Sequence, residues 1–201
     1  TKMINNYLER QIKENFPYQP TPEQEIAVKS LSEFLLSPRS EVVFLLRGYA
    51  GTGKTSLVGA LVKTLDKLQQ KSILLAPTGR AAKVFSAYAG HSAFTIHKKI
   101  YRQRSFSNEL SNFLVNDNLT THTLYIVDEA SMISNEGLSG SAFGTGRLLD
   151  DLVQFVYSGQ RCRLLLMGDT AQLPPVGEEQ SPALYAEALK GYGLEVVEVN
   201  L

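Results

Sequence analysis

The sequence predicts a single α/β domain over residues 1–201, in which a mostly parallel β-sheet carries helices on both faces. Three observations support this fold class. Short apolar runs without alternating polar positions recur along the chain, as in strands that are buried on both faces. Helical patterns separate these runs, which favours parallel crossover connections. The chain of 201 residues, 43% of them hydrophobic, is also long enough to bury a substantial core.

The first predicted elements are a helix, a strand and a second helix. Thr21-Pro22-Glu23-Gln24 predicts a helix start, because Thr is a favoured N-cap, Pro suits the first turn and Gln completes a capping box. An apolar face continues through Leu35, and Pro38 ends this helix. Residues 42–46 predict a buried strand, and a helix follows from Lys54 to about Leu68.

The same alternation continues to the end of the chain. Further strands are predicted at 72–76, 123–127, 161–167 and 194–199. Helices are predicted after Thr78 and from Pro182 to Lys190, where Gly191 would end the second of them. Parallel sheets bind ligands at the carboxyl ends of their strands, so the loops that follow these strands are the candidate site.

Composition favours an intracellular globular protein. The single cysteine, Cys162, cannot form an internal disulfide, and its apolar surroundings predict a buried thiol in a reducing compartment. Apolar runs fall short of the roughly 20 residues that span a bilayer, and a signal-peptide pattern is missing. We therefore expect a cytoplasmic protein without membrane contact.

The charges are unevenly distributed, although 20 basic residues balance 20 acidic ones. Between Lys67 and Asn108 there are eight basic residues and no acidic one. From Glu109 onward there are thirteen acidic residues and four basic ones. The acid-free basic stretch is a candidate phosphate-binding surface. Alternatively, it is a solvated basic face that acidic neighbours balance in the fold.

A glycine-rich loop links the predicted strand at 42–46 to the next helix. Its glycines let the backbone wrap around phosphate oxygens, Lys54 supplies a charge for the β- and γ-phosphates, and the Thr55 hydroxyl suits Mg²⁺. The predicted nucleotide-binding residues in this region are Gly48, Ala50, Gly51, Thr52, Gly53, Lys54, Thr55 and Ser56. An ordinary strand-to-helix turn is the alternative to this site for ATP and Mg²⁺.

Asp128 and Glu129 follow the strand predicted at 123–127. Phosphoryl transfer needs a carboxylate to anchor Mg²⁺ and a group that orients or deprotonates the attacking water. We assign Asp128 to the metal, together with Thr55, and Glu129 to the general base. A helix N-cap with a first-turn acid is the alternative for this pair.

A third polar position follows the strand predicted at 161–167. In Gly168-Asp169-Thr170-Ala171-Gln172-Leu173-Pro174-Pro175-Val176-Gly177, Gln172 stands just beyond the strand, before a rigid proline pair. Its amide is predicted to contact the γ-phosphate or the attacking water, which gives the catalytic set Lys54, Asp128, Glu129 and Gln172. A turn with a solvent-facing glutamine is the alternative, and spacing does not decide between them.

These motifs together resemble superfamily 1 DNA helicases, most closely the RecD/Dda type of superfamily 1B. Six stretches between residues 20 and 177 match in order: Gln24, Gly48–Thr55, Ala76–Lys83, Thr95–His97, Val127–Met132 and Gly168–Val176. The resemblance implies a RecA-like first motor domain with the phosphate-binding loop of P-loop NTPases. It further implies an ATP-dependent helicase that moves 5′→3′ on single-stranded DNA, with partners in DNA repair, recombination or replication.

The resemblance also implies roles for single residues. Gln24 resembles the glutamine that reads adenine, although the capping box gives it an alternative role. Thr78 and His97 resemble residues that contact the DNA backbone and a base, and both lie in the acid-free basic stretch. The DNA-binding residues predicted in this way are Pro77, Thr78, Arg80, Lys83, His97 and Lys98.

Residues 101–122 lack a clear period, and their position resembles that of the small inserted pin subdomain of these helicases. A short hairpin of Phe113-Leu114-Val115 with Leu119, turning at Asn116-Asp117-Asn118, is one expectation, and a plain surface loop is the other. Phe106 or Phe113 could stack on bases, but a core position is favoured for both.

Relatives in the resembled family continue beyond Leu201 into a second motor domain with an arginine finger. From this comparison we expect a truncated motor that binds ATP and hydrolyses it poorly, since such arginines supply about 10³–10⁵ in rate. Two other functions remain open. One is a different P-loop NTPase, such as a nucleotide kinase or an AAA-type ATPase, and the other is a non-catalytic nucleotide-binding module.

Overall fold

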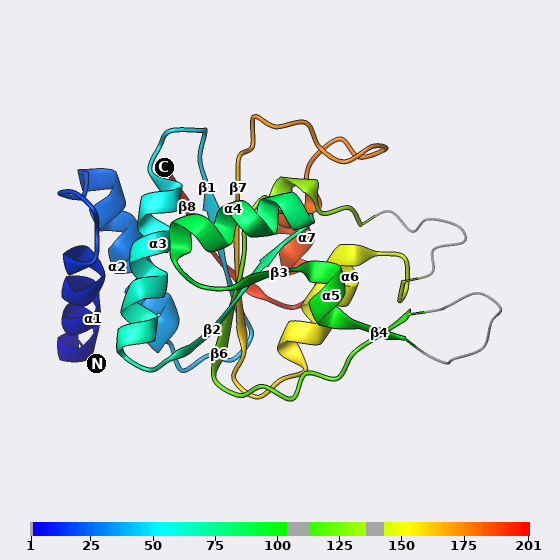
Figure 1. Ribbon diagram of the computed structural model, residues 1–201, viewed down its shortest axis with the longest axis horizontal. Coiled ribbons are helices and arrows are strands. Elements are labelled where there is room, and N and C mark those ends of the chain that lie inside the picture. The colour runs from blue at the N-terminus through cyan, green and yellow to red at the C-terminus, as the bar shows by residue number, and fades with distance from the viewer. Residues whose placement is uncertain (1, 104–112, 136–142) are drawn as a thin grey trace.

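The computed structural model describes residues 2–103, 113–135 and 143–201 (Figure 1). Its main sheet has six parallel strands in the order β3-β2-β6-β7-β1-β8. The strands are β1 (Val42–Arg47), β2 (Lys71–Ala76), β3 (Ala93–Thr95), β6 (Thr123–Val127), β7 (Arg163–Gly168) and β8 (Glu195–Asn200). This confirms the predicted fold class and each of the five predicted strands.

Helices cover both faces of the sheet. They are α1 (Lys2–Glu14), α2 (Pro22–Leu36), α3 (Lys54–Lys67), α4 (Gly79–Ala89), α5 (Ile96–Ile100), α6 (Leu148–Tyr157) and α7 (Ala186–Lys190), with 3-10 turns at Ala130–Met132 and Pro182–Leu184. Figure 1 shows α1, α2 and α3 together on one side, whereas α4 lies crosswise to the strands with its last turn toward α3. Among the described helices, none has the length and apolar content to cross a membrane.

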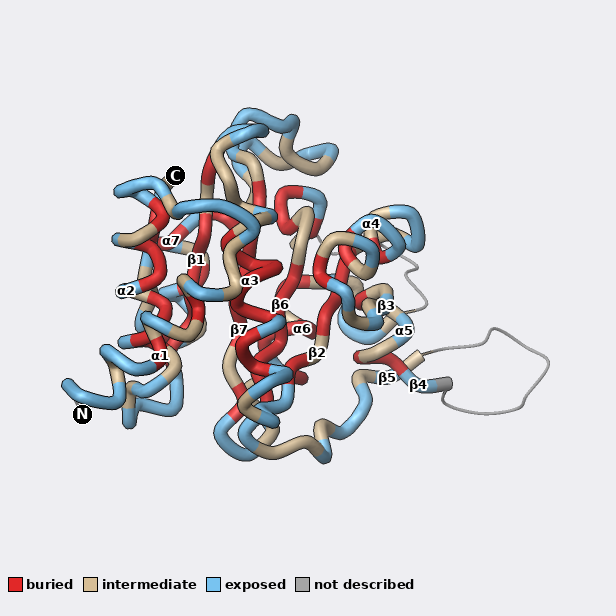
Figure 2. Tube along the Cα trace, turned by 60° about the vertical axis from the view of Figure 1, so that its left-hand side comes forward, coloured by how far each residue is buried: buried red, intermediate tan, exposed pale blue. Residues whose placement is uncertain are grey.

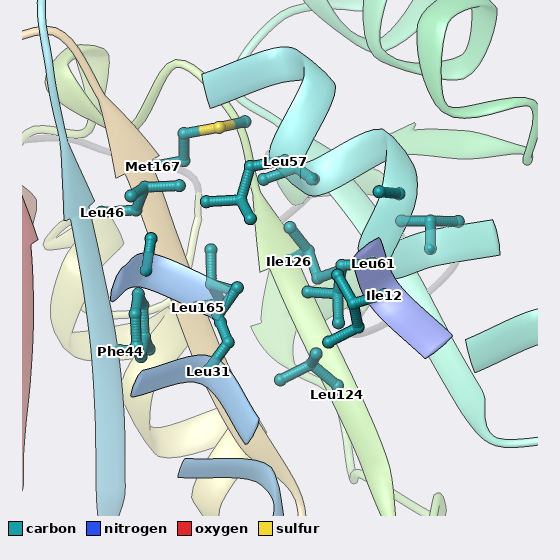
Figure 3. Close-up of a cluster of buried hydrophobic side chains, with 14 of the residues drawn as sticks. Ile12, Leu31, Phe44, Leu46, Leu57, Leu61, Leu124, Ile126, Leu165 and Met167 are labelled. Carbon is teal, nitrogen blue, oxygen red and sulfur yellow. The ribbon is translucent and has the colours of Figure 1, made fainter. Parts of the chain in front are cut away.

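Two apolar clusters hold the helices to the sheet, one on each face. Alternate strand residues divide between them: Phe44, Leu46 and Ile126 face α1, α2 and α3 (Figure 3). Their neighbours Leu45 and Tyr125 belong to the cluster on the other face. Successive side chains of a strand point to opposite faces, so strands that are apolar at both sets of positions need helices on both sides. Figure 2 shows the resulting buried band along the strands.

The local signals at the first predicted helix act as expected. Thr21 accepts a hydrogen bond from the Gln24 N–H, and the Gln24 side chain accepts one from the Thr21 N–H, which completes the capping box of α2. Cys162 is buried, with 2% of its surface exposed, as its apolar surroundings predicted.

Two predicted boundaries need correction. The strand predicted from residue 161 starts at Arg163, because Arg161 has a φ of 55° and so lies outside the extended region. The helix predicted from Pro182 to Lys190 is interrupted at Tyr185, whose backbone is extended. Arg47 donates to the Leu184 carbonyl at that point.

The predicted hairpin has a different partner strand. β5 (Phe113–Val115) pairs antiparallel with β4 (Tyr101–Gln103), not with residues around Leu119. Asn116 continues this ladder by donating to the Ile100 carbonyl, so it does not turn the chain back on itself. Arg104 and Phe106 lie outside the described residues, and the role of 101–122 as a pin stays a prediction.

Candidate functional site

The glycine loop follows β1 and leads directly into α3. Gly51 and Gly53 have φ values of 82° and 95°, a left-handed backbone that favours glycine. A Cβ on Gly53 would lie 2.2 Å from the Gln24 Nε2 atom, so the loop also needs glycine there for lack of space. The loop thus has a glycine-dependent backbone, and its phosphate contacts stay a prediction.

Lys54 lies inside the loop, at the start of α3. Its ammonium donates to the carbonyls of Gly48 and Tyr49, at 2.5 and 2.8 Å. Burial lowers the pKa of Lys54, and the negative charges of Asp169, Asp128 and Glu129 oppose this shift. The lysine therefore shares one electrostatic site with carboxylates from two other strand ends.

Asp128 and Glu129 lie at the end of β6. Burial raises the pKa of Asp128, and bonds from Tyr88 and from the Glu129 N–H, together with the charge of Lys54, oppose that rise. Burial and then the neighbouring charge of Asp128 raise the pKa of Glu129. Glu129 itself has a φ of 54°, which is uncommon outside glycine, where the chain turns into the 3-10 segment. Two crowded carboxylates with raised pKa values are typical of a reactive site.

Gln172 connects the loop after β7 to this carboxylate pair. Its Oε1 atom accepts a hydrogen bond from the Ser131 hydroxyl at 2.7 Å, and its side chain also bonds to Glu129. Ser131 is fully buried and was not singled out from the sequence. Gln172 is exposed to solvent, but its amide oxygen contacts Ser131 in the segment that carries the proposed base.

Gln24 packs against the glycine loop from α2. Its Nε2 atom donates to the Tyr18 hydroxyl at 2.9 Å and to the Gly53 carbonyl at 3.2 Å, while its Oε1 atom accepts from Thr21. Only 1% of Gln24 is exposed, and both of its amide hydrogens are engaged. The side chain thus fixes the loop to α2, and a direct adenine contact stays a prediction.

Tyr18 also lies beside the nucleotide loop, although the sequence pattern did not indicate it. Its hydroxyl bonds to Gln24 and to the Ser56 side chain, and these bonds lower its pKa. Nearly half of its surface remains exposed, at 47%. Aromatic residues before a capping box have no spacing rule of their own, so the sequence held no signal for this contact.

The Thr55 hydroxyl and the Asp128 carboxylate are the candidate metal ligands. Both offer oxygen, the donor that Mg²⁺ prefers, and Mg²⁺ usually takes one or two protein ligands together with substrate phosphates and water. Within the described residues there is no group of three or more His, Cys, Asp or Glu side chains that could hold a metal without such help. The donors therefore fit a metal that binds together with a nucleotide.

The predicted DNA-binding residues follow two neighbouring strands. β2 and β3 pair up to their last residues, with Ala76 opposite Thr95, so Pro77-Thr78 and the first turn of α5, which carries His97, begin side by side. The Thr78 hydroxyl caps α4 by accepting from the Ala81 N–H at 3.1 Å. Burial lowers the pKa of His97, whose ring lies 4.9 Å from the Phe143 ring between centroids, so its neutral form is favoured.

Arg80, Lys83 and Lys98 present the basic charge of this region to solvent. All three side chains are exposed, and none forms an ion pair with another described residue. Lys98 instead lies 5.7 Å from the centre of the half-exposed Phe94 ring. Exposed, unpaired cations of this kind are suited to phosphate contacts.

The base of the β4–β5 hairpin is an aromatic cluster. The Phe113 and Phe143 rings stack with centroids 4.7 Å apart, and Tyr101 lies 5.3 Å from Phe143. Phe113 packs against the core cluster on that face of the sheet. Phe113 is thus half-buried at the margin of the core, packed against its buried members.

Comparisons with known proteins give the chain a family. A family model described as an AAA domain matches residues 19–197. The ATP-dependent RecD2 DNA helicase of Deinococcus radiodurans is 33% identical over 156 residues, which cover 75% of this chain and 19% of that protein. Uncharacterized protein R530 of Acanthamoeba polyphaga mimivirus is 28% identical over 187 residues, covering 79% of this chain and 34% of the relative.

A solved structure supports the fold. The crystal structure of Pif1 helicase from Candida albicans matches with a TM-score of 0.53 and 21% identity, covering 92% of this chain and 40% of that one. This likeness bears on the fold, and it agrees with the predicted RecA-like architecture. The chain thus spans about a third or less of the length of the RecD2 and R530 proteins.

Proposed function

The chain belongs to the AAA domain family, and we propose that it is a superfamily 1B motor domain of the RecD and Pif1 type, which binds Mg-ATP and couples hydrolysis to movement on single-stranded DNA. The family makes it an ATP-binding, nucleotide-hydrolysing enzyme. Coupling to DNA and 5′→3′ direction extend that family assignment.

One observation carries the proposal: three groups needed for phosphoryl transfer lie at the ends of three adjacent strands. β6, β7 and β1 are neighbours in the sheet, and they are followed by Asp128-Glu129, the Gln172 loop and the glycine loop. Lys54 is close enough to Asp128 and Glu129 for their charges to affect its pKa. Catalysis of phosphoryl transfer rests on positioning and on electrostatic stabilisation, which this convergence supplies.

The residues divide the work by their chemistry. The glycine-loop N–H groups and Lys54 bind phosphate oxygens, and Thr55 and Asp128 supply oxygens for the metal. Mg²⁺, when bound, neutralises charge on the phosphates. Glu129 accepts a proton from the attacking water, because its raised pKa makes it a stronger base than an exposed glutamate. Gln172 holds Glu129 in place and is positioned to respond when the γ-phosphate is lost.

The proposal includes slow hydrolysis by this chain. Within the described residues, Lys54 is the cation whose charge reaches both Asp128 and Glu129, and no arginine acts on their pKa values. An arginine aimed at the γ-phosphate contributes about 10³–10⁵ in rate to related enzymes. A second domain of the same polypeptide is the proposed source of that residue.

Nucleotide binding is tested with Lys54→Ala. Titration of a fluorescent ATP analogue should give saturable, Mg²⁺-dependent binding to the original chain and at least a tenfold weaker affinity for the variant, because a phosphate-binding charge is removed. Lys63→Ala, on the same helix α3 but away from the loop, is the matched control. Equal affinity of all three proteins would remove the proposed site.

DNA binding separates the motor from other P-loop NTPases and from a nucleotide-binding module. Fluorescence anisotropy with a labelled oligo-dT should show an affinity that falls as salt rises. The slope of log affinity against log salt concentration should be smaller in magnitude by about 0.7 for each phosphate that a variant no longer neutralises. We expect Lys83→Glu and Lys98→Glu to weaken binding, and Lys29→Glu, an exposed lysine on α2, to leave it unchanged. Absence of salt-dependent binding would favour an NTPase of another class.

A further inference from the structure

Tyr88 contacts the carboxylate that is assigned to the metal, although it belongs to none of the sequence motifs. Its hydroxyl donates a hydrogen bond of 2.7 Å to the Oδ2 atom of Asp128. The two residues are 40 positions apart in the chain. Tyr88 comes from the last turn of α4, and Asp128 follows β6.

The ring of Tyr88 is firmly held. It stacks on Phe85, one turn earlier in α4, with ring centroids 5.2 Å apart and planes 28° from parallel. Phe85 is fully buried in the cluster between α3 and the sheet. A Cβ added to Gly59 of α3 would lie 3.5 Å from the Tyr88 carbonyl, so the two helices are in close contact here. The position of the hydroxyl is therefore fixed by packing.

The Tyr88 hydroxyl donates its single hydrogen to Asp128. Burial raises the pKa of Tyr88, and the negative charge of Asp128 raises it further. A protonated phenol donates one hydrogen, and Asp128 is the acceptor within reach.

Tyr88 completes the fixation of Asp128 without blocking it. The Oδ1 atom accepts from the Glu129 N–H at 2.7 Å, so the two carboxylate oxygens are held by donors from different elements. Each carboxylate oxygen has two lone pairs, which leaves one on each atom for a further ligand. Both rotation of the carboxylate and its displacement from the site would cost a hydrogen bond.

We propose that Tyr88 is a positioning residue, which holds the Asp128 carboxylate in the orientation that binds the metal of the nucleotide complex. The inference rests on the proposed function and adds a residue to that site. Partners that orient a metal ligand typically contribute 10- to 100-fold to metal affinity. We therefore expect a similar contribution from one hydroxyl group.

Tyr88→Phe tests the proposal, because it removes one oxygen and keeps the ring that stacks on Phe85. Free Mn²⁺ is measured by electron paramagnetic resonance during titration into the chain with a saturating non-hydrolysable ATP analogue. The variant should bind Mn²⁺ about tenfold more weakly or worse. Its affinity for the analogue in EDTA should equal that of the original chain. Tyr157→Phe, which removes a hydroxyl that donates to the Val42 carbonyl, is the control.

Three results would overturn the assignment or its premise. Equal Mn²⁺ affinity in Tyr88→Phe and the original chain would show that the hydroxyl does not position the carboxylate. A loss of melting temperature and of metal-free nucleotide affinity beyond that of Tyr157→Phe would assign Tyr88 to the fold alone. If the original chain failed to bind the analogue at all, the proposed function would fall first, and the role of Tyr88 with it.

Discussion

Glu129 combines a catalytic assignment with a cost to the fold. Burial and the adjacent Asp128 raise its pKa, which means that the folded state disfavours its charge. In addition, its φ of 54° places it in a region that few residues other than glycine adopt. Strain and crowded charge at one residue are features that a stable fold does not require, and they are common at reactive positions.

Glu129→Gln should separate the two effects. Hydrolysis should fall by about 10²–10⁴, because the general base is lost, while nucleotide affinity is retained. The unfolding free energy without nucleotide should rise at neutral pH. The gain is absent below the ordinary pKa of 4.5, grows as pH rises towards the raised pKa and is complete above it. Urea unfolding at several pH values measures it, and a variant less stable at neutral pH would contradict the assigned cause.

Gln24 illustrates how one residue can satisfy two sequence rules at once. The spacing identified it correctly as part of a capping box, and resemblance assigned it to adenine. In the folded chain its amide bonds to Thr21, Tyr18 and Gly53. Sequence spacing could not reveal Tyr18 or Gly53, because those contacts depend on how α2 meets the glycine loop.

We expect Gln24→Ala to weaken ATP and GTP binding by the same factor. The variant removes bonds that fix the loop, and it should also destabilise the fold by about 1–3 kcal/mol. Isothermal titration with both nucleotides gives the ratio of affinities. A selective loss of ATP binding would instead restore the adenine-reading role.

The glycine loop and the hairpin base are the elements where local geometry matters most. In the loop, Gly53 has both a left-handed backbone and a neighbour 2.2 Å from the place of a Cβ. Gly79, the first residue of α4, has open space at the same position. Two glycines that both stand at the start of a helix therefore differ in their tolerance of a methyl group.

Gly53→Ala should abolish tight nucleotide binding and lower the melting temperature. The added methyl would displace the Gln24 side chain, and alanine would be strained in the left-handed backbone of Gly53. Gly79→Ala should leave nucleotide affinity unchanged and stabilise the fold slightly, since alanine is the better helix former. Melting curves and nucleotide titrations of both variants check this. Similar behaviour of the two would show that the loop tolerates rearrangement.

Asp151 anchors the hairpin base to α6. It is fully buried and accepts from the Tyr101 hydroxyl at 2.6 Å and from both the hydroxyl and the N–H of Thr145. Asp151→Ala should cost about 3 kcal/mol or more in unfolding free energy, since it leaves several donors without an acceptor. Asp150→Ala, on the same helix and bonded to the Tyr192 hydroxyl, should cost less. Denaturant titration of both variants measures the two costs. A larger loss of unfolding free energy in Asp150→Ala than in Asp151→Ala would contradict the prediction.

The missed elements differ in their local signals. α1 and α6 are amphipathic, and α6 has Asp150 and Asp151 in its first turn, so both carry helical patterns that were overlooked, although α6 begins after Arg147 without a side-chain cap. β3 and α5 are short, and their positions depend on pairing with β2. At the interruption near Tyr185, Arg47 donates a long-range bond to the Leu184 carbonyl, a contact that sequence spacing does not reveal. Strands and glycine loops are encoded locally, whereas β3 and α5 depend on tertiary contacts.

At the scale of the whole molecule, both candidate sites lie at the carboxyl ends of the parallel strands, on the same side of the sheet. The nucleotide residues follow β1, β6 and β7, and the candidate DNA residues follow β2 and β3, which are joined to β6 in the same sheet. Fold class could be predicted from sequence, and so could the common end of the sheet at which the proposed nucleotide residues lie, because parallel strands fix where their loops lie. Tyr18 and Tyr88 could not, because they approach the site from other elements, whereas Ser131 stands two residues after Glu129 and was overlooked.

We predict slow turnover by the chain, because its candidate site is built from the ends of one sheet and has one principal cation among the described residues. ATP hydrolysis should stay below about one per second, with or without oligo-dT, because Lys54 is the principal cation near the carboxylates. A phosphate-release assay measures the rate, and Lys54→Ala gives the background. Rapid turnover that depends on DNA and disappears in Lys54→Ala would show that this domain is sufficient.

Helix α4 has a mechanical consequence. It starts next to Thr78 and carries Tyr88 in its last turn, and a helix of 11 residues is a stiff rod about 16 Å long. A rod transmits a displacement of one end to the other instead of absorbing it. If DNA shifts the first turn of α4, the Tyr88 hydroxyl that donates to Asp128 moves as well. A single rigid helix would then couple DNA engagement to metal binding.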